Sequence, residues 1–456
     1  MTSHHHDVIV VGAGFAGLSA ASALAEAGLK VLVLEARPQL GGRATAFADR
    51  ETGELVDNGQ HVLFGCYRAT FQFLERVGAA GNVRRQTTLE LPCYDGDGVR
   101  SALRCPRIPA PVHLLAGVLK WKPIPWRERL AAMRLARPLL EARRSLRVRA
   151  TVDTGGGSET VAQWLVRHGQ GPVLRAWLWE PLAVAALNQS VHHAAAAPFV
   201  RVLAEMFAPD PAAAAIVLPT RPLHEMYAEP ARRYISARGG DVRTSALARI
   251  AVRDGVAEGV EIRGEPATAR AVLSAVAWHS LSNLFAPAAP DLLATMLANA
   301  AAMEPQPIVT VNLWYDREVM PELFAGLPGR TMQWVFDKRM AFGGRASHLS
   351  LVSSGATEIA SRPNEFLTAL AAREVAESLP AARGATLVRA TVIREKRATF
   401  SLAPGQPPRP GPRTAVRGLY LAGDWTNTGL PATIESAVVS GHIAAAAILQ
   451  ELGARS

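Results

Sequence analysis

Cysteines, acidic residues and long apolar runs are all scarce in this sequence of 456 residues. The three cysteines, Cys66, Cys93 and Cys105, form no C-x-x-C motif and cannot all pair, which suits a reducing cytoplasm and favours packed thiols over a redox centre. No uncharged apolar run reaches the roughly eighteen residues that a membrane-spanning helix needs, so we expect no such helix. The run His4–His6 is too short to predict a metal site, and no metal is expected. No cationic leader with an apolar core opens the chain, so we expect a cytoplasmic protein.

Basic residues outnumber acidic ones, and the net charge is +10. The excess is concentrated in residues 120–149, a stretch with ten cations and two anions that also contains Trp121 and Trp126. An apolar segment, residues 111–119, precedes it, and this combination indicates a peripheral segment that lies on an anionic membrane surface. The alternative is an ordinary exposed helix, and Pro138 interrupts the helical pattern. No recognition fold accompanies the charge, so nucleic acid is not expected as a partner.

A dinucleotide-binding pattern occupies the first forty-three residues. An apolar strand leads into Gly12, Gly14 and Gly17, which are spaced as G-x-G-x-x-G. Gly12 allows a tight turn, Gly14 lets the backbone approach a pyrophosphate, and Gly17 lets the helix pack closely on the strand. The helix opens with Phe15 and Ala16, and its N-terminus offers free N–H groups and partial positive charge to the phosphates. The alternative is a βαβ unit with a glycine turn and no ligand.

A second apolar strand follows the helix and ends at Glu35 and Ala36. Glu35 lies about twenty residues beyond the glycines, where a ribose hydroxyl needs an acceptor. Gly41, Gly42 and Arg43 come next, and they resemble the extension found in FAD proteins of the amine oxidase and phytoene desaturase superfamily. The resemblance implies that FAD is the cofactor, that the two glycines pass close to it, and that the arginine adds charge near its pyrophosphate.

Two later segments continue the FAD-type pattern. In the middle of the chain a helix end, a glycine turn and a strand follow one another, and the resemblance places the backbone near Leu247 against the adenine. Near the C-terminus an apolar strand ends at Gly423 and Asp424, and Asp424 can accept hydrogen bonds from ribityl hydroxyls. A helix beginning near Ala432 would point its positive end at the flavin N1–C2=O edge. The alternative is a strand and helix without a ligand. The residues expected to contact FAD here are Thr433, Ile434 and Ser436.

The three segments are far apart in the sequence, so we predict an α/β fold with a discontinuous Rossmann-type FAD-binding domain and an inserted α+β substrate domain. Residues 308–315 alternate like a sheet strand and fall within an insertion. The predicted FAD-binding domain comprises residues 1–75, 220–285 and 412–456, and the predicted substrate domain comprises residues 76–219 and 286–411.

The stretch Asp-Asn-Gly-Gln-His at residues 57–61 resembles the hydroxysqualene dehydroxylases of bacterial hopanoid pathways, as do residues 179–188 and 218–220. These enzymes were earlier described as squalene-associated FAD-dependent desaturases, and the resemblance covers nearly the whole chain. It implies reductive removal of the allylic hydroxyl of hydroxysqualene, a long-chain isoprenoid alcohol, to give squalene. Loss of water leaves a resonance-stabilised cation that a hydride from reduced FAD can quench. An external electron donor is expected, because no second dinucleotide fingerprint is found.

This reaction needs a proton donor for the leaving oxygen. We favour His61, with Gln60 orienting the hydroxyl, because both follow the turn that the superfamily places near the flavin and a histidine can donate near neutral pH. Gly59 in that turn is expected to contact FAD. Asp57 is an alternative donor, and a structural, hydrogen-bonded role is the other interpretation of His61.

Three other functions share parts of this pattern. Amine oxidases carry two caging aromatic residues where this chain has Leu430 and Thr433, which suit a hydrocarbon better than a cation. Carotenoid or phytoene desaturation, with oxidised FAD taking a hydride from a polyene precursor, is the main alternative. Prenyl-lipid-binding carriers are similar in fold but non-enzymatic and do not use FAD, and the retained glycines and Arg43 argue against that class.

Overall fold

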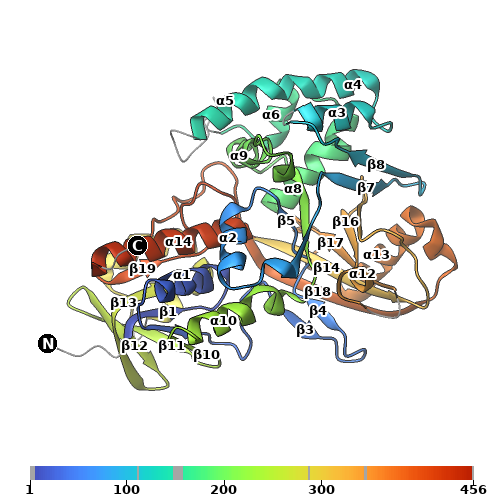
Figure 1. Cartoon of the computed structure of the whole chain (residues 1–456). Helices are drawn as coiled ribbons and strands as arrows, with labels where there is room; N and C mark the ends of the chain where they lie inside the picture. The colour runs from blue at the N-terminus through green and yellow to red at the C-terminus, as the bar shows by residue number, and fades with distance from the viewer. Residues whose placement is uncertain (1–5, 110–111, 147–157, 286–287, 344–346, 454–456) are drawn as a thin grey trace.

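The computed structural model describes residues 6–109, 112–146, 158–285, 288–343 and 347–453. His4 and His5, and Arg147 and Arg149 at the end of the basic stretch, lie outside these residues. Figure 1 shows two large sheets with helices packed on them and a separate group of helices at the top of the molecule. The arrangement is the mixed α/β fold expected from the sequence.

The first large sheet is built from segments that are distant in the sequence. Its strands are β1 (His6–Val11), β2 (Val31–Leu34), β10 (Asp241–Arg243), β11 (Ala248–Arg253), β12 (Val256–Ile262), β13 (Glu265–Ser274) and β19 (Leu419–Leu421). Their order is β10-β2-β1-β13-β12-β11, with β19 paired to β13. β1 runs parallel to β2 and to β13, and β19 runs parallel to β13. All of β2 and most of β1 are buried, as expected of parallel strands covered on both faces. The domain boundaries proposed from the sequence stay a prediction.

Helices cover this first sheet. They include α1 (Phe15–Glu26), α2 (Arg68–Arg76), α10 (Glu229–Ser236), α11 (Ala294–Ala301) and α14 (Ile434–Leu452). α1 and α14 lie side by side at the left of Figure 1. A Cβ atom on Gly441 of α14 would lie 2.4 Å from the carbonyl oxygen of Ala16, so only glycine allows this approach. The close contact joins the C-terminal helix to the helix that follows the glycine turn.

The second large sheet carries most of the inserted residues. Its strands are β7 (Glu90–Tyr94), β8 (Arg100–Arg104), β14 (Pro305–Tyr315), β15 (Phe324–Gly326), β16 (Trp334–Asp337), β17 (Ser347–Ser353) and β18 (Leu387–Phe400), in the order β18-β14-β17-β16-β15-β7-β8. Val309, Val311 and Leu313 of β14 pack in one core with α13 (Asn364–Ser378). Thr310 and Asn312 alternate with them and therefore face the opposite side of the sheet. The short helix α12 (Lys338–Phe342) follows β16 directly.

Two small sheets fasten the segment that contains residues 57–61. One pairs β3 (Ala46–Ala48) with β4 (Leu55–Asp57). The other has β9 (Ile216–Pro219) between β5 (Leu63–Phe64) and β6 (Val83–Arg85). The loop from Asp57 to His61 is thus held by a strand on each side.

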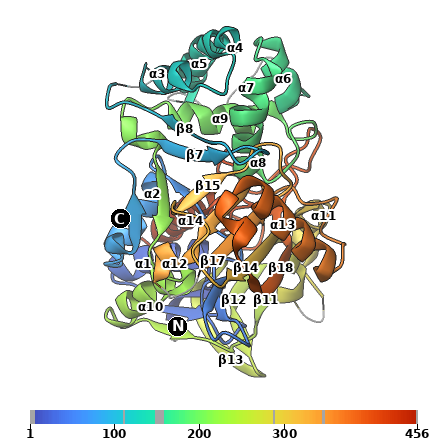
Figure 2. The same ribbon diagram turned by 90° about the vertical axis from the view of Figure 1, so that its right-hand side faces the viewer.

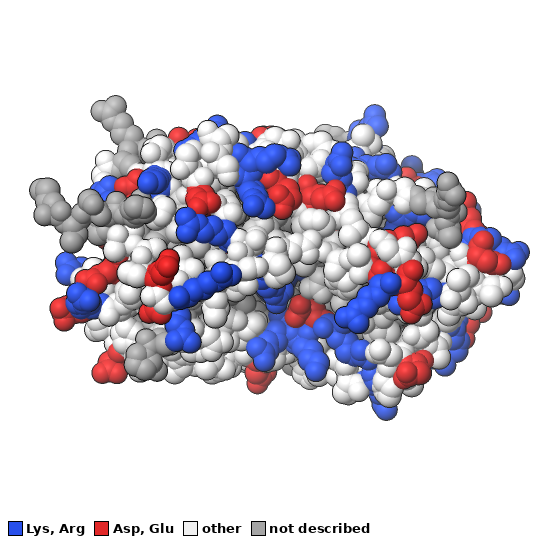
Figure 3. Space-filling model, turned by 90° about the horizontal axis from the view of Figure 1, so that it is seen from below, with Lys and Arg blue, Asp and Glu red and all other residues white. Residues whose placement is uncertain are grey.

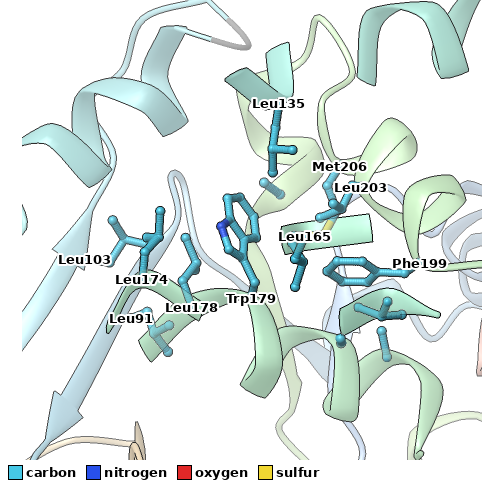
Figure 4. Close-up of a cluster of buried hydrophobic side chains, with 14 of the residues drawn as sticks. Leu91, Leu103, Leu135, Leu165, Leu174, Leu178, Trp179, Phe199, Leu203 and Met206 are labelled. Carbon is cyan, nitrogen blue, oxygen red and sulfur yellow. The ribbon is translucent and has the colours of Figure 1, made fainter. Parts of the chain in front are cut away.

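The group of helices at the top of Figures 1 and 2, residues 112–146 and 158–206, is called here the helical cap. It contains α3 (Val112–Lys120), α4 (Trp126–Ala131), η2 (Ala132–Leu135), α5 (Ala136–Leu146), α6 (Val161–Arg167), α7 (Pro172–Leu174), η3 (Arg175–Trp179), α8 (Glu180–Leu187) and α9 (Ala196–Met206). Figure 4 shows its core, where Leu135, Leu165, Trp179 and Phe199 point toward one another. Trp121 is 2% exposed and belongs to this core. The prediction of an interfacial role is therefore wrong for Trp121.

Candidate functional site

The glycine turn between β1 and α1 has the geometry of a phosphate cradle. Gly12 has a φ of +109°, and a Cβ atom there would lie 2.9 Å from the carbonyl oxygen of Ala275. A Cβ atom on Gly17 would lie 1.9 Å from the carbonyl oxygen of Gly12. Gly14 caps α1 without any side-chain hydrogen bond, so the first-turn N–H groups at Phe15 and Ala16 suit an external acceptor such as a phosphate.

Glu35 is fixed beside this turn at the end of β2. Its buried carboxylate accepts hydrogen bonds from the backbone N–H groups of Ala13 and Arg37, both at 3.0 Å. Each carboxylate oxygen retains a lone pair for a ribose hydroxyl. The N–H of Ala246 donates to the carbonyl of Glu35 at 2.9 Å, so Leu247, whose side chain is exposed, lies near Glu35 and Ala36.

The twin glycines lie directly against the glycine turn. The N–H of Gly41 donates to the carbonyl of Ala13 at 2.9 Å, and a Cβ atom on Gly42 would lie 3.5 Å from the Cα of Gly14. Tyr227 donates its hydroxyl proton to the carbonyl of Gly41 at 2.8 Å and stacks on Phe15 with ring centroids 3.6 Å apart. Sequence reasoning missed Tyr227, because nothing in its local pattern shows that it reaches this loop.

Arg43 joins the N-terminal segment to the C-terminal one. Its guanidinium forms a salt bridge with Asp424 at 2.5 Å and donates to the carbonyl of Ala398. Gly423, just before Asp424, has a φ of +150°, and a Cβ atom there would lie 2.6 Å from the Trp425 ring. The structure thus brings the Gly41–Arg43 loop and the end of β19 to one place.

The N-terminus of α14 approaches the same place. The Thr433 hydroxyl caps the helix by accepting from the N–H of Ser436 at 3.1 Å, and Ser436 donates its own hydroxyl to the carbonyl of Asp424 at 3.1 Å. Ile434 is the first helical residue. The glycines that leave room for a ligand are therefore surrounded by polar groups. These are two helix N-termini, a carboxylate at the end of β2 and an arginine. This donor set fits the pyrophosphate, ribose and flavin groups of FAD.

Glu435 is a structural residue that sequence reasoning missed. Its buried carboxylate accepts from the N–H groups of Ala69 and Thr70, both at 2.9 Å, and from the Thr70 hydroxyl at 2.7 Å. It therefore caps α2 and ties that helix to the start of α14. Burial raises the pKa of Glu435 despite these hydrogen bonds.

The loop of residues 57–61 meets a buried lysine from the second sheet. Lys338, the first residue of α12, donates from Nζ to Asp57 Oδ2 at 2.6 Å and to Gln60 Oε1 at 2.7 Å. The side chains of Lys338 and Asp57 are each only 3% exposed. Asp57 Oδ1 also accepts from the N–H of Leu223 at 3.1 Å. Burial lowers the pKa of Lys338, and the Asp57 carboxylate opposes this shift.

Lys338 borders a cavity of about 630 Å³ between the small sheets and α12. Asn82, Arg221, Phe342 and His348 also line this cavity. Sequence reasoning did not select Lys338, because a single lysine after an apolar strand looks like an ordinary surface residue. Only the pairing with Asp57, which is 281 positions away, shows that the lysine is buried.

His61 is hydrogen bonded inside its own loop. Its Nδ1 lies 2.9 Å from the carbonyl oxygen of Gly59, and a carbonyl can only accept, so Nδ1 carries the proton. Burial lowers the pKa of His61, although the Gly59 carbonyl and Asp57 oppose the shift. A neutral ring with a proton on Nδ1 presents Nε2 as an acceptor. The hydrogen bond to Gly59 is the kind that the structural interpretation of His61 expects, and the catalytic roles suggested for His61 and Gln60 stay predictions.

The polar face of β14 lies close to this loop. A Cβ atom on Gly59 would lie 3.7 Å from Thr310 Oγ1. Asn312 Oδ1 accepts from His348 Nε2 at 3.0 Å, whereas Asn312 Nδ2 has no hydrogen-bond partner among the described residues. A buried amide donor without a partner suits a bound ligand or water.

Apolar side chains border the other side of the loop. Val62 and Phe64, which follow His61, pack against the same hydrophobic cluster as the core of the helical cap. Ile308, Phe336 and Val352 of the second sheet belong to or contact that cluster as well. Among the described residues no group of three or more metal-ligating side chains occurs. The loop of residues 57–61 therefore lies between the buried ammonium group of Lys338, which borders the polar cavity, and the apolar cluster that Val62 and Phe64 contact.

Comparisons with known proteins agree with the expected fold and family. The family model of the flavin containing amine oxidoreductases matches residues 15–449. Hydroxysqualene dehydroxylase of Rhodopseudomonas palustris is 30% identical over 453 residues, which cover 97% of this chain and 98% of that protein. A zeta-carotene desaturase of Zea mays is 24% identical over 477 residues, covering 95% of this chain and 82% of that protein. The solved structure of cyclohexylamine oxidase from Brevibacterium oxydans superposes with a TM-score of 0.71 at 17% identity, covering 98% of this chain and 99% of that one.

Proposed function

The chain belongs to the family of flavin-containing amine oxidoreductases and is an FAD-dependent oxidoreductase; we propose that it reductively removes the allylic hydroxyl of hydroxysqualene to give squalene for hopanoid biosynthesis. One observation carries the proposal, namely the buried ammonium group of Lys338 beside Gln60, on the loop that leads into the apolar residues Val62 and Phe64. Loss of water from an allylic alcohol requires a proton donor, and a dry surrounding protects the resulting cation from water.

Lys338 is the proposed proton donor, in place of His61. It holds three protons on Nζ and directs two of them to Asp57 and Gln60. Nζ also lies 4.1 Å from the centroid of the Phe342 ring, but the third proton has no hydrogen-bond acceptor among the described residues and is the one proposed for the hydroxyl of the substrate. Gln60 Nε2 donates one N–H to the carbonyl of His61 at 3.2 Å and retains the second N–H to orient the same oxygen. Asp57 is proposed to position Lys338 and to keep it protonated, since a neighbouring carboxylate favours the charged form of an amine. His61 Nε2 can accept a hydrogen bond from the departing water.

The FAD-contacting residues remain those proposed from the sequence. The backbone of residues 12–17 and 41–42 would hold the pyrophosphate, and Glu35 would hold the adenosine ribose. Asp424 and the first turn of α14, at Thr433, Ile434 and Ser436, would face the ribityl chain and the flavin. Reduced FAD supplies a hydride when it is bound, and the protein's own part is to place the allylic carbon and to protonate the oxygen that leaves.

The proposed partners are a long-chain isoprenoid alcohol and an external electron donor that keeps FAD reduced. The name of the relative from Rhodopseudomonas palustris supports the substrate class. No helix in the part of the chain that the structure describes is both long and apolar enough to cross a bilayer. The proposal places the protein in the cytoplasm, where a hydrocarbon substrate would reach it from the inner face of the cell membrane.

Carotenoid-type desaturation is the second candidate, and the similarity to zeta-carotene desaturase supports it. Desaturation removes a hydride from carbon and needs no acid for a leaving oxygen, so it gives the proton on Lys338 no role. A non-enzymatic prenyl-lipid carrier would need neither the phosphate cradle nor the salt bridge between Arg43 and Asp424.

Incubation under anaerobic conditions separates these functions. Chemically reduced holoenzyme is mixed with hydroxysqualene, and oxidised holoenzyme is mixed with phytoene, with products identified by mass spectrometry. We expect squalene in the first mixture, together with oxidation of the flavin, and no new double bonds in the second. Retention of oxygen by hydroxysqualene in the presence of fully reduced flavin would rule out dehydroxylation, and a polyene from phytoene would establish the second candidate.

A further inference from the structure

An apolar stripe runs along the outer surface of the helical cap. α4, η2 and α5 follow one another without a break from Trp126 to Leu146. Trp126 is 64% exposed, Leu130 46%, Met133 50% and Leu140 44%. These four residues are spaced by three, four or seven positions and therefore share one side of the helices.

The inward side of the same helices is already filled. Ala132, Leu135, Leu139 and Ala142 are buried in the core of the cap, as Figure 4 shows for Leu135. The outer stripe is therefore not needed to close that core. Pro138 does not interrupt the pattern, contrary to the sequence-based expectation, because it lies in the first turn of α5, where a backbone N–H need not find a partner within the helix.

Basic side chains border the stripe. Arg127 lies over the ring of Trp126 at 5.5 Å, and Arg137 and Arg144 continue the helical spacing beyond Met133 and Leu140. Glu141 is the one exposed acid among residues 112–146, and Arg137 already pairs with it at 2.8 Å. Neither Arg127 nor Arg144 forms an ion pair within the described structure.

The exposed apolar residues extend beyond α4 and α5. Ile108, Val112 and Leu119 are also exposed, so residues 108–140 carry seven of the sixteen large hydrophobic residues that are exposed in the described parts of the chain. The helices lie at one end of the molecule in both Figure 1 and Figure 2. Figure 3, which views the molecule from below, shows positive and negative side chains interspersed on that face. The cap end thus combines exposed apolar groups with an excess of basic side chains.

We propose that the outer face of α3, α4 and α5 docks on the surface of an anionic phospholipid bilayer, with Trp126, Leu130, Met133 and Leu140 in the interface. The positive charge favours an anionic bilayer as the partner, because arginines beside an apolar stripe are complementary to acidic headgroups above acyl chains. The other face of the same helices packs on the cluster that borders the candidate site. A membrane-docked cap would thus hold that site close to a source of hydrocarbon substrate, although docking itself does not depend on the proposed reaction.

Vesicle sedimentation of the full-length holoenzyme tests this surface. We expect binding to phosphatidylcholine vesicles that contain phosphatidylglycerol, weak binding to phosphatidylcholine alone, and loss of binding as salt is added. The triple variant Trp126→Ser/Leu130→Ser/Leu140→Ser should bind roughly tenfold or more weakly. Arg127→Gln/Arg144→Gln should weaken binding at low salt by roughly fivefold per charge.

Matched variants away from the cap control for general effects. Phe366→Ser/Val388→Ser removes exposed apolar groups and Arg249→Gln/Arg373→Gln removes exposed charges, and both should bind vesicles as the wild type does. Absence of binding to phosphatidylglycerol vesicles, or an equal loss in these controls, would overturn the proposal. The proposal would also fail if the wild type is a dimer that does not bind vesicles while the triple serine variant is a monomer. The stripe would then be a subunit interface. Thermal unfolding of each variant shows whether it is folded.

Discussion

Two cation–carboxylate pairs hold the candidate site together, and they differ in what their cations can do. Arg43 and Asp424 join the N-terminal and C-terminal segments that are proposed to bind FAD, and their side chains are 30% and 6% exposed. Lys338 and Asp57 join the second sheet to the loop of residues 57–61, and both side chains are 3% exposed. An arginine keeps its proton at any physiological pH, whereas a buried lysine can release one. The first pair can only anchor, whereas the second is proposed both to anchor and to supply a proton.

The largest effect is expected where the second pair is broken. Lys338→Met should lower kcat for dehydroxylation by about 10² to 10⁴-fold, the usual contribution of a general acid, while FAD content stays normal. It should also destabilise the fold by about 3–5 kcal/mol, because Asp57 is left buried without a counter-charge. Steady-state kinetics and chemical denaturation measure the two effects.

A double variant separates the two roles of Lys338. Lys338→Met/Asp57→Asn removes both charges, and the asparagine oxygen can still accept from the N–H of Leu223, so most of the stability should return without the activity. If activity returns together with stability, Lys338 is structural and the proton comes from another group.

Breaking the first pair should affect cofactor binding instead. Arg43→Met should weaken FAD binding by roughly 10- to 100-fold, which corresponds to about 1.4–2.7 kcal/mol. With FAD in excess, kcat should recover to near the wild-type value, because Arg43 transfers no proton. Titration of apoprotein with FAD gives the affinity, and a kcat that stays low at saturation would contradict the distinction between the two pairs.

The two ion pairs also differ in how far their residues could be predicted from the sequence. The glycine turn, Glu35 and the Gly41–Arg43 loop can be located because their geometry depends on local spacing. Burial of Lys338 depends on a contact 281 positions away, and no local signal marks it. Trp121 and Trp126 show the same limit: they are five positions apart in one basic stretch, yet the first is core and the second is exposed. Local pattern indicates which residues lie near a turn, but tertiary packing decides which side chains are buried.

A pH-dependent effect of intermediate size is expected near the second pair. Burial lowers the pKa of His348 to about 3, and the charge of Lys338 contributes to this. Below the unfolded pKa of about 6.5 the unfolded chain takes up a proton that the folded chain does not, so stability should fall as the pH drops from 6.5 toward 3. The slope attributable to His348 approaches about 1.4 kcal/mol per pH unit. Denaturation of wild type and His348→Gln at pH 7, 6 and 5 measures this slope, which should be smaller in the variant; equal slopes would mean that His348 does not titrate in this way.

The smallest effect concerns the two helix N-termini that border the FAD site. Thr433 caps α14 with its side chain, whereas Gly14 caps α1 without one, and the proposed function assigns those N–H groups to FAD. Thr433→Ala should therefore cost about 1 kcal/mol of stability whether or not FAD is bound, because the Thr433 hydroxyl is engaged by Pro431 and Ser436 within the protein, so that its proposed contact with FAD would come from the backbone. Gly14→Ala should instead act mainly on the holoprotein, since a Cβ there would meet only one atom within 4 Å, the carbonyl oxygen of Gly41 at 3.9 Å, and would intrude on the ligand. Thermal unfolding with and without FAD distinguishes the two variants. The loss of stability in Thr433→Ala should be the same in both states. A loss of stability in Gly14→Ala that is as large without FAD as with it would show that the turn is shaped by folding rather than by the cofactor.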